Sequence, residues 1–193
     1  LEPGIFSVIS FPTGAGKSSS SELKIATALL RNMKVVFLAP TLSLVDQTTR
    51  ALANTFPNAE VHREILDELL FNLENDSLPA ISVMTPERCL AMLSFDPGIF
   101  SSVGLLVFDE CHLLHPRDAD HSRRSIDSML CLLNFTSVAP KADLLLLSAM
   151  MKNSEEIADW VSELTSRPCL PLALTWKPTR QVRGCVVYAG DEI

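Results

Sequence analysis

Phe11-Pro12-Thr13-Gly14-Ala15-Gly16-Lys17-Ser18 is the stretch of sequence that decides the fold. It follows an apolar run at residues 5–10, typical of a buried strand, and precedes a helical pattern at residues 19–31. A glycine-containing loop between a strand and a helix turns backbone N–H groups toward one point, and the helix N-terminus adds a partial positive charge. The stretch therefore predicts a site for the phosphates of a nucleoside triphosphate.

Two side chains of this loop match the chemistry of such a site. Lys17 would contact the β- and γ-phosphates, and the Ser18 hydroxyl would ligate Mg²⁺. The loop departs from the pattern G-x-x-x-x-G-K-[ST] at one position, because Phe11 stands where glycine is usual. The strand before the loop and the amphipathic helix after it support the nucleotide-binding interpretation.

The composition narrows the class of protein. The chain has 193 residues, 47% of them hydrophobic, which suffices for the core of one domain. Acidic residues outnumber basic ones by 23 to 16, which argues against a polyanion-binding surface over the whole domain but leaves contact through a few loops. Five cysteines without a CxxC pair fit reduced thiols, so we expect a cytoplasmic protein, or a nuclear one in a eukaryote. No apolar run approaches the roughly 18–20 residues of a membrane span, so we expect no membrane partner.

Strands and helices alternate along the chain. Continuous apolar runs, as strands buried on both faces require, occupy residues 5–10, 34–39, 80–84, 103–108 and 142–148. Apolar residues at helical spacing are Leu23, Ala26, Thr27 and Leu30, then Ile126, Met129, Leu130 and Leu133, then Ile157, Trp160, Val161 and Leu164. Further helices fit residues 43–55 and 63–74. Thr85-Pro86 predicts a helix start, and Asn153 with Glu156 predicts a capping box.

This alternation predicts an α/β fold with a parallel sheet. Ligands of such sheets bind at the carboxyl ends of the strands. The phosphate loop and the segments at 40–43, 109–112 and 148–150 all follow predicted strands, so we expect them to gather at one edge of the sheet.

The apolar run at 103–108 ends in two carboxylates, Asp109 and Glu110. Asp109 would hold Mg²⁺, usually through water, and Glu110 would orient and deprotonate the attacking water. The alternative is a strand that ends in a solvated acidic turn, which is a common arrangement. The nucleotide loop elsewhere in the chain favours the catalytic interpretation.

Three motifs, in this order, resemble motifs I, II and III of superfamily 2 helicases of the DExH type: FPTGAGKS at 11–18, DECH at 109–112 and SAM at 148–150. APTLSLVDQ at 39–47 resembles motif Ia, and MTPE at 84–87 resembles motif Ib. The segment after motif III is similar to the Ski-type and DNA-repair-type branch. The resemblance implies a RecA-like P-loop NTPase fold, with a parallel sheet flanked by helices on both faces.

The resemblance also implies a role for each matching residue. ATP and Mg²⁺ would be bound by Thr13, Gly14, Ala15, Gly16, Lys17 and Ser18 together with Asp109. Hydrolysis would be linked to strand movement by His112 and by motif III, which consists of Ser148, Ala149 and Met150. The nucleic-acid backbone would be contacted by Thr41, Thr85, Pro86 and Glu87. For these last residues, plain helix capping is the alternative, although capping and phosphate binding are compatible.

The domain organisation is expected to be that of a first motor domain. Residues 1–166 would form the RecA-like ATP-binding domain, and the proline-containing residues 167–193, with a strand at Val182 to Tyr188, would lead toward a second RecA-like domain. The first residue is Leu rather than Met, so we expect a piece of a larger protein, monomeric in isolation.

The predicted function is that of an ATP-dependent motor that moves along or unwinds DNA or RNA, with a single strand favoured. One alternative is the translocase motor of a restriction or defence complex, which moves on duplex DNA without unwinding it. Another is a nucleotide-gated interaction module with little turnover. The presence of Lys17, Asp109 and Glu110 argues against this last alternative.

Overall fold

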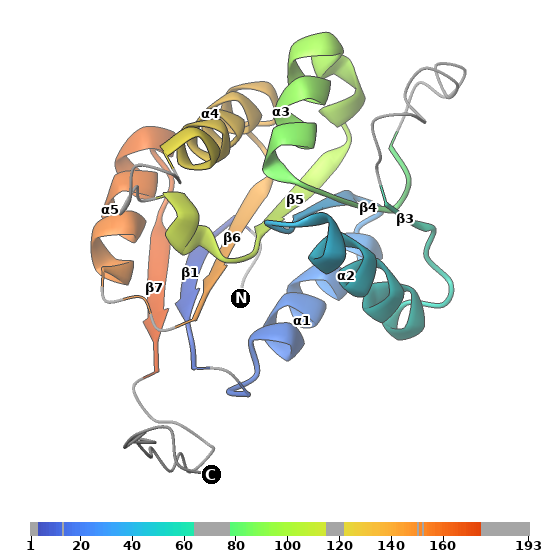
Figure 1. Ribbon diagram of the computed structural model, residues 1–193, viewed down its shortest axis with the longest axis horizontal. Coiled ribbons are helices and arrows are strands. Elements are labelled where there is room, and N and C mark those ends of the chain that lie inside the picture. The colour runs from blue at the N-terminus through green and yellow to red at the C-terminus, as the bar shows by residue number, and fades with distance from the viewer. Residues whose placement is uncertain are drawn as a thin grey trace, which may run out of the picture.

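The computed structural model describes residues 4–12, 14–63, 78–114, 122–149, 151 and 153–174. In these residues seven strands form one sheet in the order β3-β4-β2-β5-β6-β1-β7 (Figure 1). The strands are β1 (Phe6–Ser10), β2 (Lys34–Leu38), β3 (Val61–Arg63), β4 (Ile81–Met84), β5 (Val103–Phe108), β6 (Asp143–Ser148) and β7 (Cys169–Ala173). All pairs are parallel, which confirms the predicted α/β fold.

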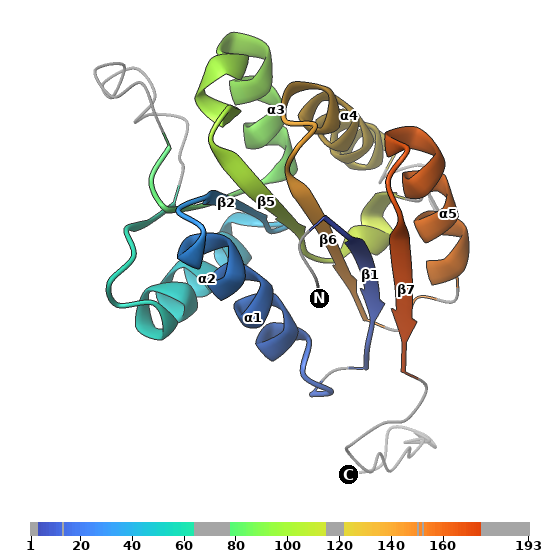
Figure 2. The same cartoon turned by 180° about the vertical axis from the view of Figure 1, so that it is seen from behind.

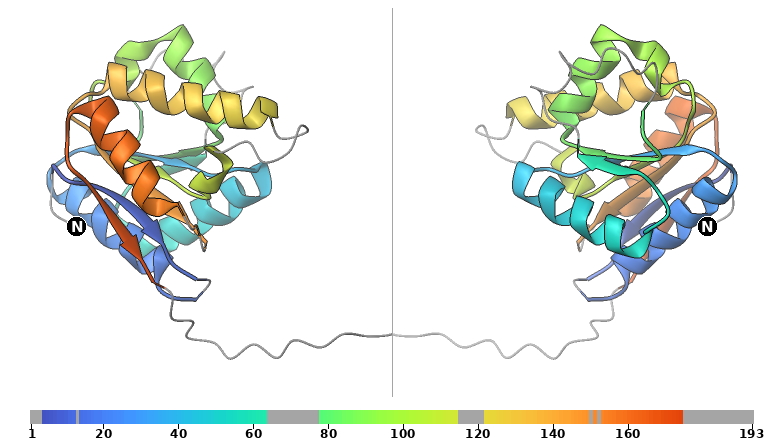
Figure 3. Two further views of the ribbon diagram at one scale, coloured as in Figure 1. Left: turned by 90° about the vertical axis from the view of Figure 1, so that its left-hand side faces the viewer. Right: turned by 90° about the vertical axis from the view of Figure 1, so that its right-hand side faces the viewer.

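Helices cover both faces of the sheet. Those in the described residues are α1 (Lys17–Leu30), α2 (Leu42–Thr55), α3 (Pro86–Phe95), α4 (Ser122–Val138) and α5 (Ser154–Thr165), with short 3₁₀ turns at Pro97–Phe100 and Cys111–Leu114. Helices α1 and α2 lie on one face, and α3, α4 and α5 lie on the other (Figures 2 and 3). Among the described residues, no helix is both long and apolar enough to cross a membrane.

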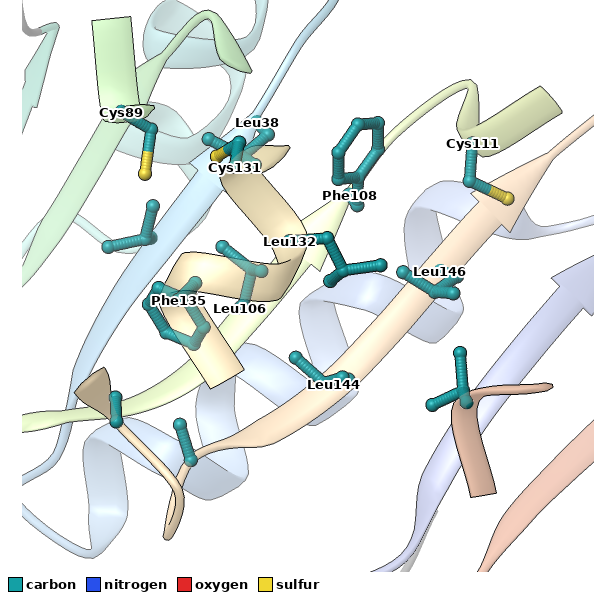
Figure 4. Close-up of a cluster of buried hydrophobic side chains, with 14 of the residues drawn as sticks. Leu38, Cys89, Leu106, Phe108, Cys111, Cys131, Leu132, Phe135, Leu144 and Leu146 are labelled. Atoms are coloured by element: carbon teal, nitrogen blue, oxygen red, sulfur yellow. The ribbon is translucent and has the colours of Figure 1, made fainter. Parts of the chain in front are cut away.

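The central strands are buried on both faces, as their continuous apolar sequence requires. In β5, Leu106 and Phe108 belong to the core under α3, α4 and α5, where Phe135 of α4 packs (Figure 4). Leu105 and Val107 belong to the second core, which includes residues of α1 and α2. The sheet therefore separates two apolar cores.

Helices α1 and α4 are present where the apolar spacing predicts them, but several of the apolar residues that mark the spacing are exposed. Leu23 and Leu30 of α1 are 61% and 87% exposed, and Ile126 of α4 is 57% exposed. The buried face of α1 contains mainly small and polar residues, whereas that of α4 combines such residues with large apolar ones. The buried residues are Ser21, Lys24, Ile25 and Ala28 in α1 and Ser125, Ser128, Cys131, Leu132 and Phe135 in α4. Small side chains let a helix approach a sheet that already supplies large apolar residues, so counting leucines selects the wrong face.

Of the two predicted helix caps, at Thr85 and Asn153, only the first forms. Thr85 caps α3 and accepts a hydrogen bond from Arg88 N at 3.3 Å, with proline at the first helical position, as predicted. Asn153 precedes α5, but its side chain makes no capping hydrogen bond, so the predicted capping box does not form. In α5, Val161 is buried as expected.

Two strands were not predicted. β3 is only three residues long, and β7 contains Pro171, which fits its position at the edge of the sheet beside β1. The helix predicted at 63–74 falls, apart from Arg63 in β3, outside the described residues, and so does the strand predicted at Val182 to Tyr188.

A buried carboxylate joins the beginnings of several elements at the amino edge of the sheet. Asp143, the first residue of β6, lies 3.3 Å from Lys24 Nζ and 2.7 Å from an Arg167 guanidinium nitrogen. Its two oxygens also accept the Gly4 N–H at 3.0 and 3.1 Å. The Arg167 guanidinium stacks on Phe6 at 4.1 Å. Residues before β1, within α1 and before β7 are thus held together by one side chain.

Candidate nucleotide and nucleic-acid site

The segments singled out in the sequence meet at the carboxyl edge of the sheet. The phosphate loop follows β1, Thr41 follows β2, Thr85 follows β4, Asp109 follows β5, and Ala149 follows β6. Because all strands are parallel, these ends lie on the same edge (Figure 1). Thr13 and Met150 lie outside the described residues.

The phosphate loop has the backbone of an anion cradle. Gly14 and Gly16 have φ values of 80° and 92°, in the left-handed region that favours glycine, and Ala15 N–H donates to the Pro12 carbonyl at 3.1 Å. Gly16 is the N-cap of α1, and no side chain accepts a capping hydrogen bond there. The first N–H groups of the helix are therefore available to a ligand. Lys17 is partly buried, and Ser18 is exposed at this helix start.

The two carboxylates after β5 occupy different environments. Asp109 N–H donates to the Leu38 carbonyl, and Asp109 Oδ1 accepts the Glu110 N–H at 2.9 Å. Burial raises the pKa of the Asp109 carboxyl, and the charge of Glu110 adds to this rise. Glu110 itself has a φ of 53°, a left-handed conformation that is unusual for glutamate. Strain of this kind concentrates at functional sites.

Glu110 connects the phosphate loop with the residues after β5. Its Oε1 lies 3.8 Å from Lys17 Nζ, and its Oε2 lies 3.1 Å from His112 Nδ1. Oε2 is buried, and no described residue meets it in hydrogen-bond geometry. His112 Nδ1 is also 3.3 Å from the Ser148 hydroxyl, at the end of β6. Motifs I, II and III are therefore within direct contact of one another.

Ser10, the last residue of β1, has a structural role that no motif in the sequence predicts. Its hydroxyl donates to the Met151 carbonyl at 3.0 Å and accepts the Met151 N–H at 2.7 Å. Phe11 N–H also donates to the Ser148 carbonyl at 3.2 Å. The segment after β6 is thus fastened to the strand that carries the phosphate loop. The available signal was a second serine at the end of an apolar strand, matching Ser148.

The residues expected at the nucleic-acid backbone form two neighbouring helix starts. Thr41 and Thr85 cap α2 and α3, and their hydroxyls accept from Leu44 N and Arg88 N at 3.3 Å. The strands before them, β2 and β4, are paired. Pro86 is buried, whereas Thr41 is exposed. Glu87 is partly buried in the first turn of α3.

The arrangement fits a nucleoside triphosphate with Mg²⁺. The uncapped start of α1 and the ammonium of Lys17 suit phosphates, and the Glu110 carboxylate beside Lys17 suits the role of proton acceptor for an attacking water. Among the described residues, no three His, Cys, Asp or Glu side chains form a metal cluster. A bound Mg²⁺ would therefore take most of its oxygen ligands from phosphates and water, which is its usual preference.

A parallel sheet with a phosphate loop after one strand and two carboxylates after another defines a P-loop NTPase of the RecA-like kind. The chain belongs to the DEAD/DEAH box helicase family, whose profile matches residues 5–157. The predicted identification as a first motor domain of a superfamily 2 helicase is confirmed.

Known proteins similar to this chain include helicases for both nucleic acids. The exosome RNA helicase MTR4 of Homo sapiens is 27% identical over 174 residues, which cover 89% of this chain and 15% of that protein. The ATP-dependent DNA helicase Hel308 of Thermoplasma acidophilum is 28% identical over 157 residues, covering 80% and 22%. The structure of the DUF1998 helicase MrfA bound to DNA and AMPPNP has a TM-score of 0.66 at 17% identity and shares the fold, covering 88% of this chain and 25% of that one. The chain thus spans less than a quarter of these curated relatives.

Proposed function

We propose that this domain couples ATP hydrolysis to movement along, or unwinding of, a nucleic-acid strand. The observation that carries the proposal is the position of Glu110 between Lys17 and His112, with His112 in turn next to Ser148. A carboxylate that contacts both the phosphate-loop lysine and the residues of motif III is suited to link hydrolysis with a change in the segment after β6.

Each residue of this network has a distinct task. When phosphates enter the loop, the Lys17 ammonium would exchange its ion pair with Glu110 for one with their oxygens, which would free Glu110 Oε1 to accept a proton from the attacking water. Ser18 and Asp109 would hold Mg²⁺, which supplies charge neutralisation at the phosphates. His112 and the Ser148 hydroxyl would sense the state of Glu110, and Ser10 would pass a displacement of the segment after β6 to β1.

The nucleic-acid track would lie against the starts of α2 and α3. Two adjacent helix N-termini present N–H groups and partial positive charge, which suit phosphates without reading sequence. Thr41 and Thr85 add hydroxyls, and Glu87 would border this surface. Support for a nucleic-acid partner comes from the relatives, since MTR4 is an RNA helicase and Hel308 is a DNA helicase. A single strand is the form we favour.

A second RecA-like domain would complete the site. Support comes from the small share of the relatives' length that this chain covers, 15% for MTR4 and 22% for Hel308. Alone, the domain should be a monomer that binds nucleotide weakly and hydrolyses it slowly, because the partner domain's contacts to the phosphates are missing. The buried free cysteines of the described residues fit a reducing compartment, the cytoplasm or the nucleus.

Steady-state ATPase of the full-length protein tests this function. The rate should rise strongly with either single-stranded DNA or single-stranded RNA, and Glu110→Gln should abolish the rise while the exposed Glu163→Gln leaves it unchanged. A rate near background with every polymer would favour a nucleotide-gated interaction module. Stimulation by duplex DNA without strand displacement would favour the translocase alternative. A rate for the isolated chain equal to that of the full-length protein would refute the need for a second domain.

A further inference from the structure

The amino edge of the sheet, opposite the nucleotide site, carries an open apolar hollow of about 760 Å³. We call it the amino-edge groove. Its walls are the end of α1, with Leu29, Leu30 and Met33, and the segments Thr55–Glu60 and Leu78–Ala80. Leu30 is 87% exposed at its rim, although leucine in a helix usually packs inward. The volume is within the range of about 300–1,000 Å³ that is typical of binding pockets.

Two residues that line the groove are held by neighbouring elements. Met33 and Leu29 pack against the core shared with α1 and α2. Met33 also lines a second, smaller cavity of about 190 Å³, where it packs over Gly104 of β5 so closely that a Cβ there would lie only 2.5 Å from Met33 Cβ. The two cavities therefore adjoin at Met33.

The two hollows carry positive charge in a chain that is negative overall. The smaller cavity is lined by Lys24, Arg31, Lys141 and Arg167 against Asp143, and the adjoining groove by Lys34 against Glu60, whereas the chain has a net charge of −7. Lys24 and Arg167 are engaged by Asp143. The others, Arg31, Lys34 and Lys141, form no ion pair with any described residue. Unpaired cations beside an apolar groove favour a ligand that is apolar and acidic at once.

We propose that the amino-edge groove binds an acidic, amphipathic peptide segment of a partner protein. The apolar side chains of the peptide would fill the groove between Leu30 and Phe56, and its carboxylates would face Arg31, Lys34 and Lys141. A nucleic acid is a poorer match, because strands bind through phosphate contacts and aromatic stacking, and Phe56 is the only aromatic residue among those that line the groove. The site is independent of the nucleotide and of the proposed track.

Amide chemical shifts of the ¹⁵N-labelled 193-residue chain test the proposal. The probe is a synthetic 14-residue peptide of Leu, Phe, Ala and Glu with apolar residues at helical spacing, compared with the same peptide carrying Lys for Glu. The acidic peptide should shift the amides of Leu30, Met33 and Ala80, and the basic one should not. Leu30→Ser should weaken binding about tenfold, as expected for one buried leucine, whereas Leu23→Ser on the same helix should leave it unchanged.

Charge-reversed variants separate the remaining explanations. The double variant Arg31→Glu with Lys141→Glu should weaken binding of the acidic peptide at least tenfold and should allow the basic peptide to bind. Arg50→Glu on α2 should change neither affinity. Equal binding of both peptides, or shifts confined to other surfaces, would overturn the proposal. Shifts of the same amides that depend on protein concentration alone would assign the groove to a second copy of the chain. Shifts caused by single-stranded oligonucleotides would assign it to nucleic acid. Either assignment would overturn the peptide proposal.

Discussion

Asp143→Asn removes one charge from the amino edge of the sheet while keeping the size of the side chain. In the wild type, Asp143 lies 3.3 Å from Lys24 Nζ, and the Lys24 side chain is only 3% exposed. Removing one partner of a buried ion pair costs about 3–5 kcal/mol, because the remaining charge loses a counter-charge inside a buried site. Lys24 keeps its hydrogen bond to the Ile5 carbonyl at 3.1 Å, so we expect the lower end of this range, about 3 kcal/mol.

Equilibrium urea unfolding, followed by circular dichroism, measures this change. The urea concentration at the midpoint of unfolding should fall, while the dependence of the free energy of unfolding on urea stays unchanged. Since 1 kcal/mol shifts the melting temperature of a chain of this size by about 2–4 °C, the melting temperature should fall by about 6–12 °C. Asp159→Asn on the exposed side of α5 is the control and should change the free energy of unfolding by less than about 0.5 kcal/mol. A loss below about 1 kcal/mol for Asp143→Asn would show that the carboxylate does not hold these elements together.

Three further predictions follow from the site and the sheet. Burial and the charge of Glu110 raise the pKa of Asp109. On acidification, the affinity for Mg²⁺-nucleotide should therefore begin to fall at a higher pH than it would if Asp109 had the pKa of an exposed aspartate. Glu110→Gln should move that fall to lower pH in fluorescence titrations, and an unmoved profile would contradict the assignment. Ser10→Ala leaves two buried backbone groups unpaired and should lower the free energy of unfolding by about 1–3 kcal/mol in urea titrations, with neutrality as the contrary result. Gly104→Ala should cost about 1–3 kcal/mol through its clash with Met33, and Gly104→Ala combined with Met33→Ala should recover part of that loss.

The sheet could be predicted because its central strands are covered on both faces. Such strands read as continuous apolar runs, and β2, β5 and β6 lie where the runs at 34–39, 103–108 and 142–148 placed them. Edge strands lack this signal. β7 has four exposed positions out of five and a proline, so its sequence does not differ from that of a loop until β1 is known to lie beside it.

The buried faces of the helices, unlike the central strands, could not be predicted from the positions of large apolar residues. A hydrophobic face is recognised from large apolar residues, yet α1 rests on the sheet through Ser21, Ile25 and Ala28 while Leu23 and Leu30 point to solvent. The decisive quantity is how closely the helix axis can approach the sheet, which depends on the neighbouring strands and not on the helix alone. One of these exposed leucines, Leu30, lies at the rim of the amino-edge groove.

The motif residues of the site could be predicted because their chemistry dictates both residue type and order along the chain. The chemistry of phosphate and Mg²⁺ binding predicts roles for Lys17, Asp109 and Glu110, and the family resemblance implies one for His112. In the structure, Lys17 and His112 lie on either side of Glu110. The contact of Ser10 with the segment after β6 could not be derived, since a single serine at a strand end carries no pattern.

Binding of a fluorescent ADP analogue with Mg²⁺ to the 193-residue chain tests the central claim most directly. The wild type should bind saturably, and Lys17→Ala should weaken binding at least tenfold, because the phosphates lose the one ammonium that lies at the start of α1. Lys141→Ala, at the opposite edge of the sheet, should leave the affinity unchanged. Equal affinities of the wild type and Lys17→Ala would contradict the assignment of the phosphate loop as the nucleotide site.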